Sequence, residues 1–182
     1  PRPIPGTDGL RIGHLSDIHL TGQLSQEFYH FVFERFMELA PDLIIISGDI
    51  IDTADCLPWI DPLFSRLSAP LGCAYLLGNH DRRLKSIDPL VARLNGLGLH
   101  DLGVSDLRCC LASGTKLCLY GNERPWFERH AVVPNRGQPA GETGDASDQT
   151  TLRIGVSHSP DQIGWARRRQ LDLLLAGHTH GG

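Results

Sequence analysis

Five short apolar runs, each followed directly by a polar stretch that contains Asp, Asn or His, constrain this chain more than any other feature. The clearest is Leu43-Ile44-Ile45-Ile46, which ends at Ser47-Gly48-Asp49. A continuous apolar run is typical of a strand buried on both faces, as in a parallel sheet covered by helices. The other four runs occupy residues 10–15, 74–77, 154–156 and 171–176. The run at 10–15 is also apolar enough for a buried strand.

The segments between these runs predict helices. Ser25 is suited to cap a helix that extends to about Ala40. The predicted apolar face of this helix consists of Phe28, Phe31, Val32, Phe36 and Leu39. Three more helices are predicted, at 58–67, 88–97 and 161–169, and Pro58 suits the first turn of the earliest of them. Strands that alternate with helices favour a largely parallel sheet with right-handed crossovers.

The part of the chain from Leu99 to Tyr120 has a different pattern of predicted elements. Two short strands, at 107–111 and 116–120, flank Ser113-Gly114, which is a hairpin signal. Periodicity alone therefore predicts an α/β fold with a parallel core and a small antiparallel portion. Residues 134–150 are rich in Gly, Pro, Asp, Ser and Thr and have no apolar periodicity, so a surface loop is predicted there.

The polar stretches lie where parallel α/β sheets bind their ligands, beyond the carboxyl ends of the strands. Mixed His and carboxylate ligation suits Mn, Fe or Zn, and the absence of a cysteine ligand argues against a closed structural zinc site. Asp49 follows the central-looking strand and is the natural carboxylate to bridge two cations. The candidate residues, which include five of the nine histidines, are Asp17, His19, Asp49, Asn79, His80, His158, His178 and His180.

Each of these residues also has a structural interpretation when it is taken alone. The aspartates could cap helices, Asn79 and Asp81 could be ordinary turn residues, and His178 and His180 could be surface histidines. A match of all five stretches by accident is improbable, and we therefore favour a shared metal site.

Other polar residues leave two interpretations open. His14, within the first predicted strand, is expected to be a hydrogen-bonded interior histidine. Arg82 and Arg83 either reach a substrate phosphate or are simply exposed. Residues 122–127, which combine aromatic groups with Glu and Arg, form either a pocket wall beside the metals or packing at the core or rim, and we favour packing.

The ordered set of motifs resembles the calcineurin-like metallophosphoesterase family. The motifs are Asp17-x-His19, Gly48-Asp49-x-x-Asp52, Gly78-Asn79-His80-Asp81, His158 after a strand, and Gly177-His178-x-His180. In spacing and sequence, these motifs are most similar to those of the bacterial YkuE/YaeI-like phosphodiesterases. The resemblance implies a two-sheet β-sandwich flanked by helices, with four layers in the order α/β/β/α. It also implies further strands after Gly182, so we expect a C-terminal part of the fold to lie beyond this sequence.

The resemblance implies ligands for two divalent metal ions. The first ion would be held by Asp17, His19, Asp49 and His180. The second ion would be held by Asp49, Asn79, His158 and His178. Glycines 48, 78 and 177 would allow the sharp turns that bring these ligands together.

The implied reaction is hydrolysis of a phosphoester, most similar to a phosphodiesterase. A hydroxide that bridges the metals would attack phosphorus, and His80 would protonate the leaving oxygen or stabilise the transition state. Asp81, or Asp52, would orient the catalytic groups as an outer carboxylate. The alternatives are a phosphomonoesterase, a nucleotide-sugar or lipid pyrophosphatase, and a non-catalytic metal-binding interaction module.

The net charge and the cysteine content limit which partners and which cellular compartment we expect. The net charge of −4 gives no general attraction to nucleic acid, so we expect a small-molecule or lipid-linked phosphoester substrate. Five cysteines without a C-x-x-C pair favour a reducing compartment over a disulfide scaffold. Residues 1–9 have the character of a linker, and 10–182 form the metallophosphoesterase domain. The resemblance implies membrane association of the full-length protein, which is expected in the cytoplasm or at a membrane.

Overall fold

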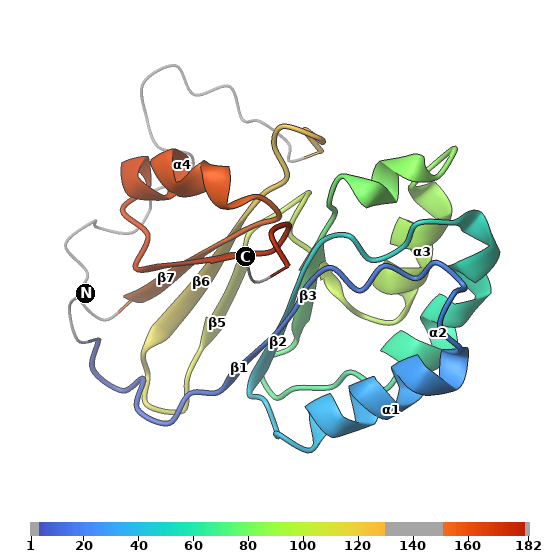
Figure 1. The fold of residues 1–182 in the computed structure, drawn as a ribbon. Coiled ribbons are helices and arrows are strands. Elements are labelled where there is room, and N and C mark those ends of the chain that lie inside the picture. The colour runs from blue at the N-terminus through green and yellow to red at the C-terminus, as the bar shows by residue number, and fades with distance from the viewer. Residues whose placement is uncertain (1–3, 130–150, 181–182) are drawn as a thin grey trace.

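Two four-stranded sheets stack face to face, and helices cover the outer face of each (Figure 1). The structure is a computed structural model that describes residues 4–129 and 151–180. The first sheet is parallel throughout and has the order β1 (Ile12–Leu15), β2 (Leu43–Ser47), β3 (Cys73–Leu76), β4 (His100–Asp101). The second sheet has the order β5 (Leu107–Cys110), β6 (Lys116–Asn122), β7 (Thr151–Ser157), β8 (Leu173–Ala176).

In the second sheet, β5 and β6 are antiparallel, whereas β6, β7 and β8 are parallel. The first sheet is covered by α1 (Gln26–Met37), α2 (Ile60–Phe64) and α3 (Asp88–Gly96), and the second by α4 (Ile163–Arg168). Short 3-10 turns occur at η1 (Ala54–Trp59), η2 (His80–Arg83) and η3 (Pro160–Gln162). The four layers confirm the architecture that the family resemblance implied, and the β5–β6 hairpin confirms the antiparallel portion.

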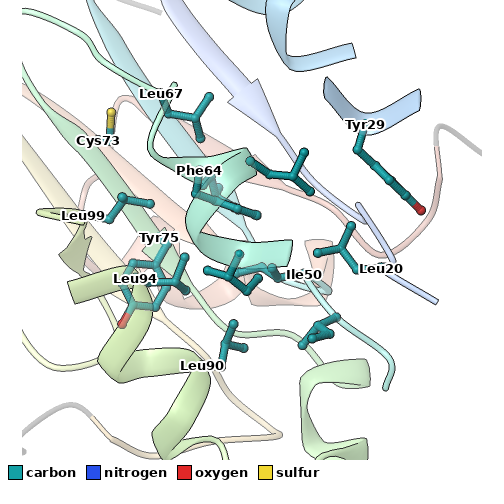
Figure 2. Close-up of a cluster of buried hydrophobic side chains, with 14 of the residues drawn as sticks. Leu20, Tyr29, Ile50, Phe64, Leu67, Cys73, Tyr75, Leu90, Leu94 and Leu99 are labelled. Carbon is teal, nitrogen blue, oxygen red and sulfur yellow. The ribbon is translucent and has the colours of Figure 1, made fainter. Parts of the chain in front are cut away.

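The apolar run of β2 serves two cores. Ile44 and Ile46 pack with the helix-covered core, whereas Leu43 and Ile45 pack between the sheets against residues such as Ile154. Figure 2 shows the helix-side core, where Phe64, Tyr75, Leu90 and Leu94 lie together. All five residues of β2 are buried, and each buried Ile or Leu side chain contributes about 1.5–3 kcal/mol to stability. The central strand is therefore held rigidly from both sides.

The strand β1 is less buried than expected. All four of its residues are half-buried, because β1 lies at one end of the strand order and has only β2 as a neighbour.

Helix α1 begins as predicted, but only part of the predicted face packs against the core. The Ser25 Oγ accepts a hydrogen bond from the Phe28 N–H at 3.3 Å, which confirms the cap. The helix buries Tyr29 and Phe33, whereas three residues of the predicted face are 46, 61 and 66% exposed: Phe28, Phe31 and Leu39. The predicted face was right for Val32 and Phe36, which pack against the helix-side core. It was wrong for the exposed residues, because apolar residues surround most of this helix and periodicity could not select the side that meets Phe64.

The predicted helix at 58–67 is shorter and begins differently. Pro58 lies inside the 3-10 turn η1, and α2 spans only five residues. Both Pro58 and Pro62 lack a backbone N–H, and this limits α-helical hydrogen bonding in the segment. The helices predicted at 88–97 and 161–169 are confirmed as α3 and as η3 with α4.

The two predicted irregular segments fall partly outside the described residues. The loop expected at 134–150 lies outside them, as do residues 1–3 of the expected linker. Residues of the described part of 1–9 contact the β5–β6 hairpin, because Thr115 Oγ1 donates to the Pro5 carbonyl at 2.7 Å and Ser113 Oγ donates to the Gly6 carbonyl at 2.8 Å. None of the described helices combines the length and the apolar character needed to cross a bilayer.

Ala40 gives a stability prediction for the fold. This exposed residue follows α1 with a φ of 47°, a left-handed conformation that costs a non-glycine residue about 1–2 kcal/mol. We expect Ala40→Gly to raise the free energy of unfolding by about 0.5–1 kcal/mol, because relief of this strain exceeds the entropic cost of glycine. Urea denaturation measures the change.

The matched control is Ala92→Gly, in the exposed middle of α3. There glycine is expected to lower stability by about 0.8–1 kcal/mol, since the backbone is ordinary right-handed helix. Destabilisation of similar size in both variants would contradict the account of Ala40.

Candidate metal centre

The polar stretches that follow β1, β2, β3, β7 and β8 meet at one end of the two sheets. Parallel pairing continues beyond β1 and β2, because the Asp17 N–H donates to the Gly48 carbonyl at 3.1 Å and the His19 N–H donates to the Asp49 carbonyl at 3.0 Å. His158, after β7, lies 3.0 Å from Asn79 Oδ1. The His178 N–H, after β8, lies 3.0 Å from each Asp17 oxygen. Ligand candidates from both sheets are thus brought to one place.

Asp49 lies at the centre of this cluster and is 1% exposed. Its Oδ1 accepts a hydrogen bond from the His80 N–H at 2.7 Å. Its Oδ2 lies 3.1 Å from His158 Nε2 and 3.8 Å from His19 Nε2. Burial acts to raise the pKa of Asp49, but the hydrogen bonds from His158 and from the His80 N–H outweigh it and hold that pKa below its ordinary value. The carboxylate is therefore ionised, with imidazoles on two sides.

Three sets of side chains offer ligand atoms within 4.8 Å of one another, and Asp49 belongs to two of them. The sets are Asp17, His19 and His180; His19, Asp49 and His80; and Asp49, His158 and His178. Imidazole nitrogens with carboxylate oxygens form a donor set that suits Mn, Fe or Zn. The chemistry and convergence of these residues fit a pair of divalent ions that share Asp49.

Hydrogen bonds select the ring nitrogen that each histidine presents to the cluster. His158 Nδ1 lies 2.8 Å from the Ser47 carbonyl, and His19 Nδ1 lies 2.7 Å from Asp52 Oδ2. Because a carbonyl and a carboxylate only accept, each Nδ1 carries a proton, and Nε2 is the ring nitrogen that each histidine turns toward the cluster. The Nε2 atoms of His19 and His180 approach each other to 3.3 Å, which suits two ligands of one cation.

Asp52 holds His80 as well as His19. Its Oδ1 lies 2.5 Å from His80 Nδ1 and is also paired with the Arg83 guanidinium. Burial acts to raise the pKa of Asp52, but the hydrogen bonds from His80 and His19 lower it below its ordinary value. Of the two outer carboxylates considered from the sequence, Asp52 is the one that orients His80.

Asp81, the other outer carboxylate considered from the sequence, contacts backbone N–H groups of the site loops. Its side chain is fully buried, so it cannot contact a substrate. The carboxylate accepts backbone N–H groups from Gly78 at 2.8 Å, Asp49 at 3.1 Å, Ile50 at 2.9 Å and Ile51 at 3.0 Å. Burial raises the pKa of Asp81 to about 7, although these N–H donors act in the opposite direction. Asp81 ties the turn after β3 to the loop after β2.

Unusual backbone conformations concentrate in this cluster. In the described part of the chain, seven non-glycine residues have positive φ, and five of them are candidate ligands: Asp17, His19, Asp49, His178 and His180. Such a conformation costs about 1–3 kcal/mol and persists where the surrounding structure enforces it, often at functional sites.

The motif glycines serve two different purposes. Gly48 has a φ of 94°, as expected for a sharp turn. Gly78 and Gly177 are instead required for space, because a Cβ on Gly78 would overlap the Asp49 side chain and one on Gly177 would overlap Ser16. The predicted turn role therefore applies to Gly48, and close approach explains the other two.

The residues outside the motifs are also placed. His14 Nε2 lies 2.7 Å from Ser47 Oγ, which confirms the hydrogen bond, although the residue is half-buried. Arg83 is paired with Asp52 rather than free for a phosphate, and Arg82 is exposed. Trp126, for which core or rim packing was favoured, contacts the rings of His158 and His178. In the sequence, the position of Trp126 within an aromatic stretch was the one indication of this contact.

Comparison with known proteins identifies the family. The calcineurin-like phosphoesterase family matches residues 10–182, and the chain belongs to this family. The chain is 30% identical over 189 residues to metallophosphoesterase YkuE of Bacillus subtilis, named as uncharacterized, with 97% of this chain and 60% of YkuE covered. It is 26% identical to a transmembrane protein with metallophosphoesterase domain from Danio rerio, with 96% of this chain and 41% of that protein covered.

A shorter match involves a protein whose name includes a substrate. Over 83 residues, the chain is 34% identical to UDP-2,3-diacylglucosamine pyrophosphatase LpxG of Chlamydia muridarum, with 44% of this chain and 25% of LpxG covered. The chain spans 60% or less of the length of each of these relatives.

The buried Asp81 carboxylate generates a prediction for the metal-free protein. In Asp81→Asn, an amide NH2 replaces an oxygen that accepts two backbone N–H groups. We expect a loss of unfolding free energy of about 1–3 kcal/mol for each buried donor left without an acceptor. Urea denaturation in the presence of a chelator measures the loss.

Asp61→Asn provides the control, because Asp61 forms an exposed ion pair with Arg93. Its loss is expected to cost at most about 1 kcal/mol. Equal stability of Asp81→Asn and the parent protein would show that Asp81 does not brace the two loops.

Proposed function

We propose that the protein is a phosphodiesterase that uses two divalent metal ions. The observation that carries this proposal is the position of Asp49, which is shared by two of the three ligand sets and accepts the His80 N–H. A shared carboxylate is what two cations about 3.5–4 Å apart require. Membership of the calcineurin-like phosphoesterase family supports the same reaction class.

The proposed ligands follow the family pattern. Asp17, His19, Asp49 and His180 hold the first ion. Asp49, Asn79, His158 and His178 hold the second. Bound divalent ions would supply a water of lowered pKa as the nucleophile and would neutralise the phosphoryl oxygens. Mn, Fe and Zn all suit this donor set.

His80 is the proposed proton donor to the leaving oxygen. Its Nδ1 lies 2.5 Å from Asp52 Oδ1, so Nε2 is the ring nitrogen that would deliver a proton to the leaving oxygen. Asp52 fixes the orientation of the His80 ring, and the Arg83 guanidinium is paired with the same Asp52 oxygen. His80 also belongs to a ligand set with His19 and Asp49, and the experiment below separates a proton donor from a ligand.

The proposed substrate is a small or lipid-linked phosphodiester. The partial similarity to LpxG, which is named for a pyrophosphatase activity on UDP-2,3-diacylglucosamine, favours a lipid-linked diphosphate as the second candidate substrate. We extend the proposal to membrane association of the full-length protein, which the name of the Danio rerio relative supports. Residues 10–182 form the catalytic domain in this proposal, and residues 1–9 form a linker.

A substrate panel with defined metals tests the function. The chelated protein, reloaded with Mn²⁺ or Zn²⁺, is expected to hydrolyse bis-p-nitrophenyl phosphate faster than p-nitrophenyl phosphate, and chelation is expected to abolish both activities. UDP-linked sugars test the pyrophosphatase alternative. Faster hydrolysis of the monoester would contradict the phosphodiesterase assignment, and hydrolysis that survives metal removal would contradict the metal mechanism.

His80→Ala in the same panel tests the proton donor. The variant is expected to bind as many ions as the parent and to lose about 100- to 10,000-fold in kcat. The loss should be larger for an alkyl phosphodiester than for the nitrophenyl ester, because a poor leaving group depends more on protonation. A variant that loses an ion would identify His80 as a ligand, and one that hydrolyses at the parent rate would exclude a catalytic role.

A further inference from the structure

Three aromatic rings pack against one another beside Asp49. The ring centroid of Trp126 lies 5.2 Å from that of His158 and 5.2 Å from that of His178, and the two histidine centroids are 5.1 Å apart. His158 and His178 form a ligand set with Asp49. The family motifs do not include Trp126, which comes from the segment after β6.

His178 has the greatest need of such a contact. Its backbone is fixed by the N–H that donates to Asp17 at 3.0 Å, but its side chain is exposed. His158, in contrast, is fully buried and its Nδ1 is held by the Ser47 carbonyl. A wall that restricts the His178 ring would reduce the conformational entropy lost when the ring binds a cation.

The segment that carries Trp126 is itself anchored by buried ion pairs. Glu123 is 4% exposed and accepts the Leu77 N–H at 2.7 Å, just before the turn that contains Asn79. Arg129 donates to Glu123 at 2.9 Å and to the two oxygens of Asp101 at 2.7 and 2.9 Å. The backbone N–H of Trp126 donates to the Glu123 carbonyl at 3.1 Å. The turn that holds Trp126 is thus fastened to the ends of β3 and β4.

We propose that Trp126 is a positioning residue for the second metal ion, which holds the rings of His158 and His178 at binding distance and is held in turn by the Glu123–Arg129–Asp101 network. This inference rests on the proposed metal site. Trp126 is not a ligand and donates nothing to the reaction. Its effect is on the affinity of one ion of the pair.

Titration with Co²⁺ alone tests this role. Equilibrium dialysis of the full chain is expected to give two bound ions per parent molecule. In Trp126→Ala, one ion should bind as in the parent and the other about 10- to 100-fold more weakly, as for loss of a group that orients ligands. Trp126→Phe should restore most of the affinity, because a flat ring is retained. Trp126→Leu replaces the alanine variant if that one unfolds.

Trp165→Ala is the matched control, since Trp165 is half-buried beside Gly155 and Arg169. It should bind both ions as the parent does. Indole fluorescence gives a second readout, because Co²⁺ beside His158 and His178 is expected to quench Trp126. The quenching should disappear in Trp126→Phe although both ions bind.

The outcomes separate this inference from the proposed function. Two ions bound with parental affinities in Trp126→Ala, or in Trp126→Leu where the alanine variant unfolds, would overturn the positioning role and leave the metal site intact. Fewer than two ions in the parent protein would overturn the proposed site and this inference together.

Discussion

The burial of the Asp49 carboxylate is the constraint on which the rest of the site depends. A charge without partners at this depth would cost several kcal/mol, so the structure surrounds it with an N–H from His80 and with the imidazole of His158. Those partners come from the segments after β3 and β7, and both sheets must therefore end at the same place. The left-handed residues beside Asp49 show that the backbone accepts strain to meet this requirement.

Two further buried carboxylate systems hold the loops that Asp49 needs. Asp81 binds the backbone on both sides of the gap between the β2 and β3 loops. Glu123, with Arg129 and Asp101, fastens the segment after β6 to the end of β3. Both convert loops into rigid supports, and a metal site requires ligands held within a few tenths of an ångström of their working geometry.

The convergence of the polar stretches could be predicted because parallel strands carry their carboxyl ends to one edge, and the unbroken apolar run of β2 marks a strand buried on both faces. Three features could not be predicted from residue patterns. The division into two sheets depends on long-range pairing, the buried face of α1 is ambiguous because aromatic residues surround the helix, and Trp126 lies in a segment without periodicity. The division into two sheets followed from the family resemblance alone.

The central claim is that two divalent ions share Asp49. Anomalous diffraction from a crystal grown with Mn²⁺ tests it most directly, because it locates each ion independently of activity. The account predicts two anomalous peaks, about 3.5–4 Å apart, on either side of the Asp49 carboxylate, one near His19 and His180 and the other near His158 and His178. A single peak, or two peaks that Asp49 does not join, would contradict it.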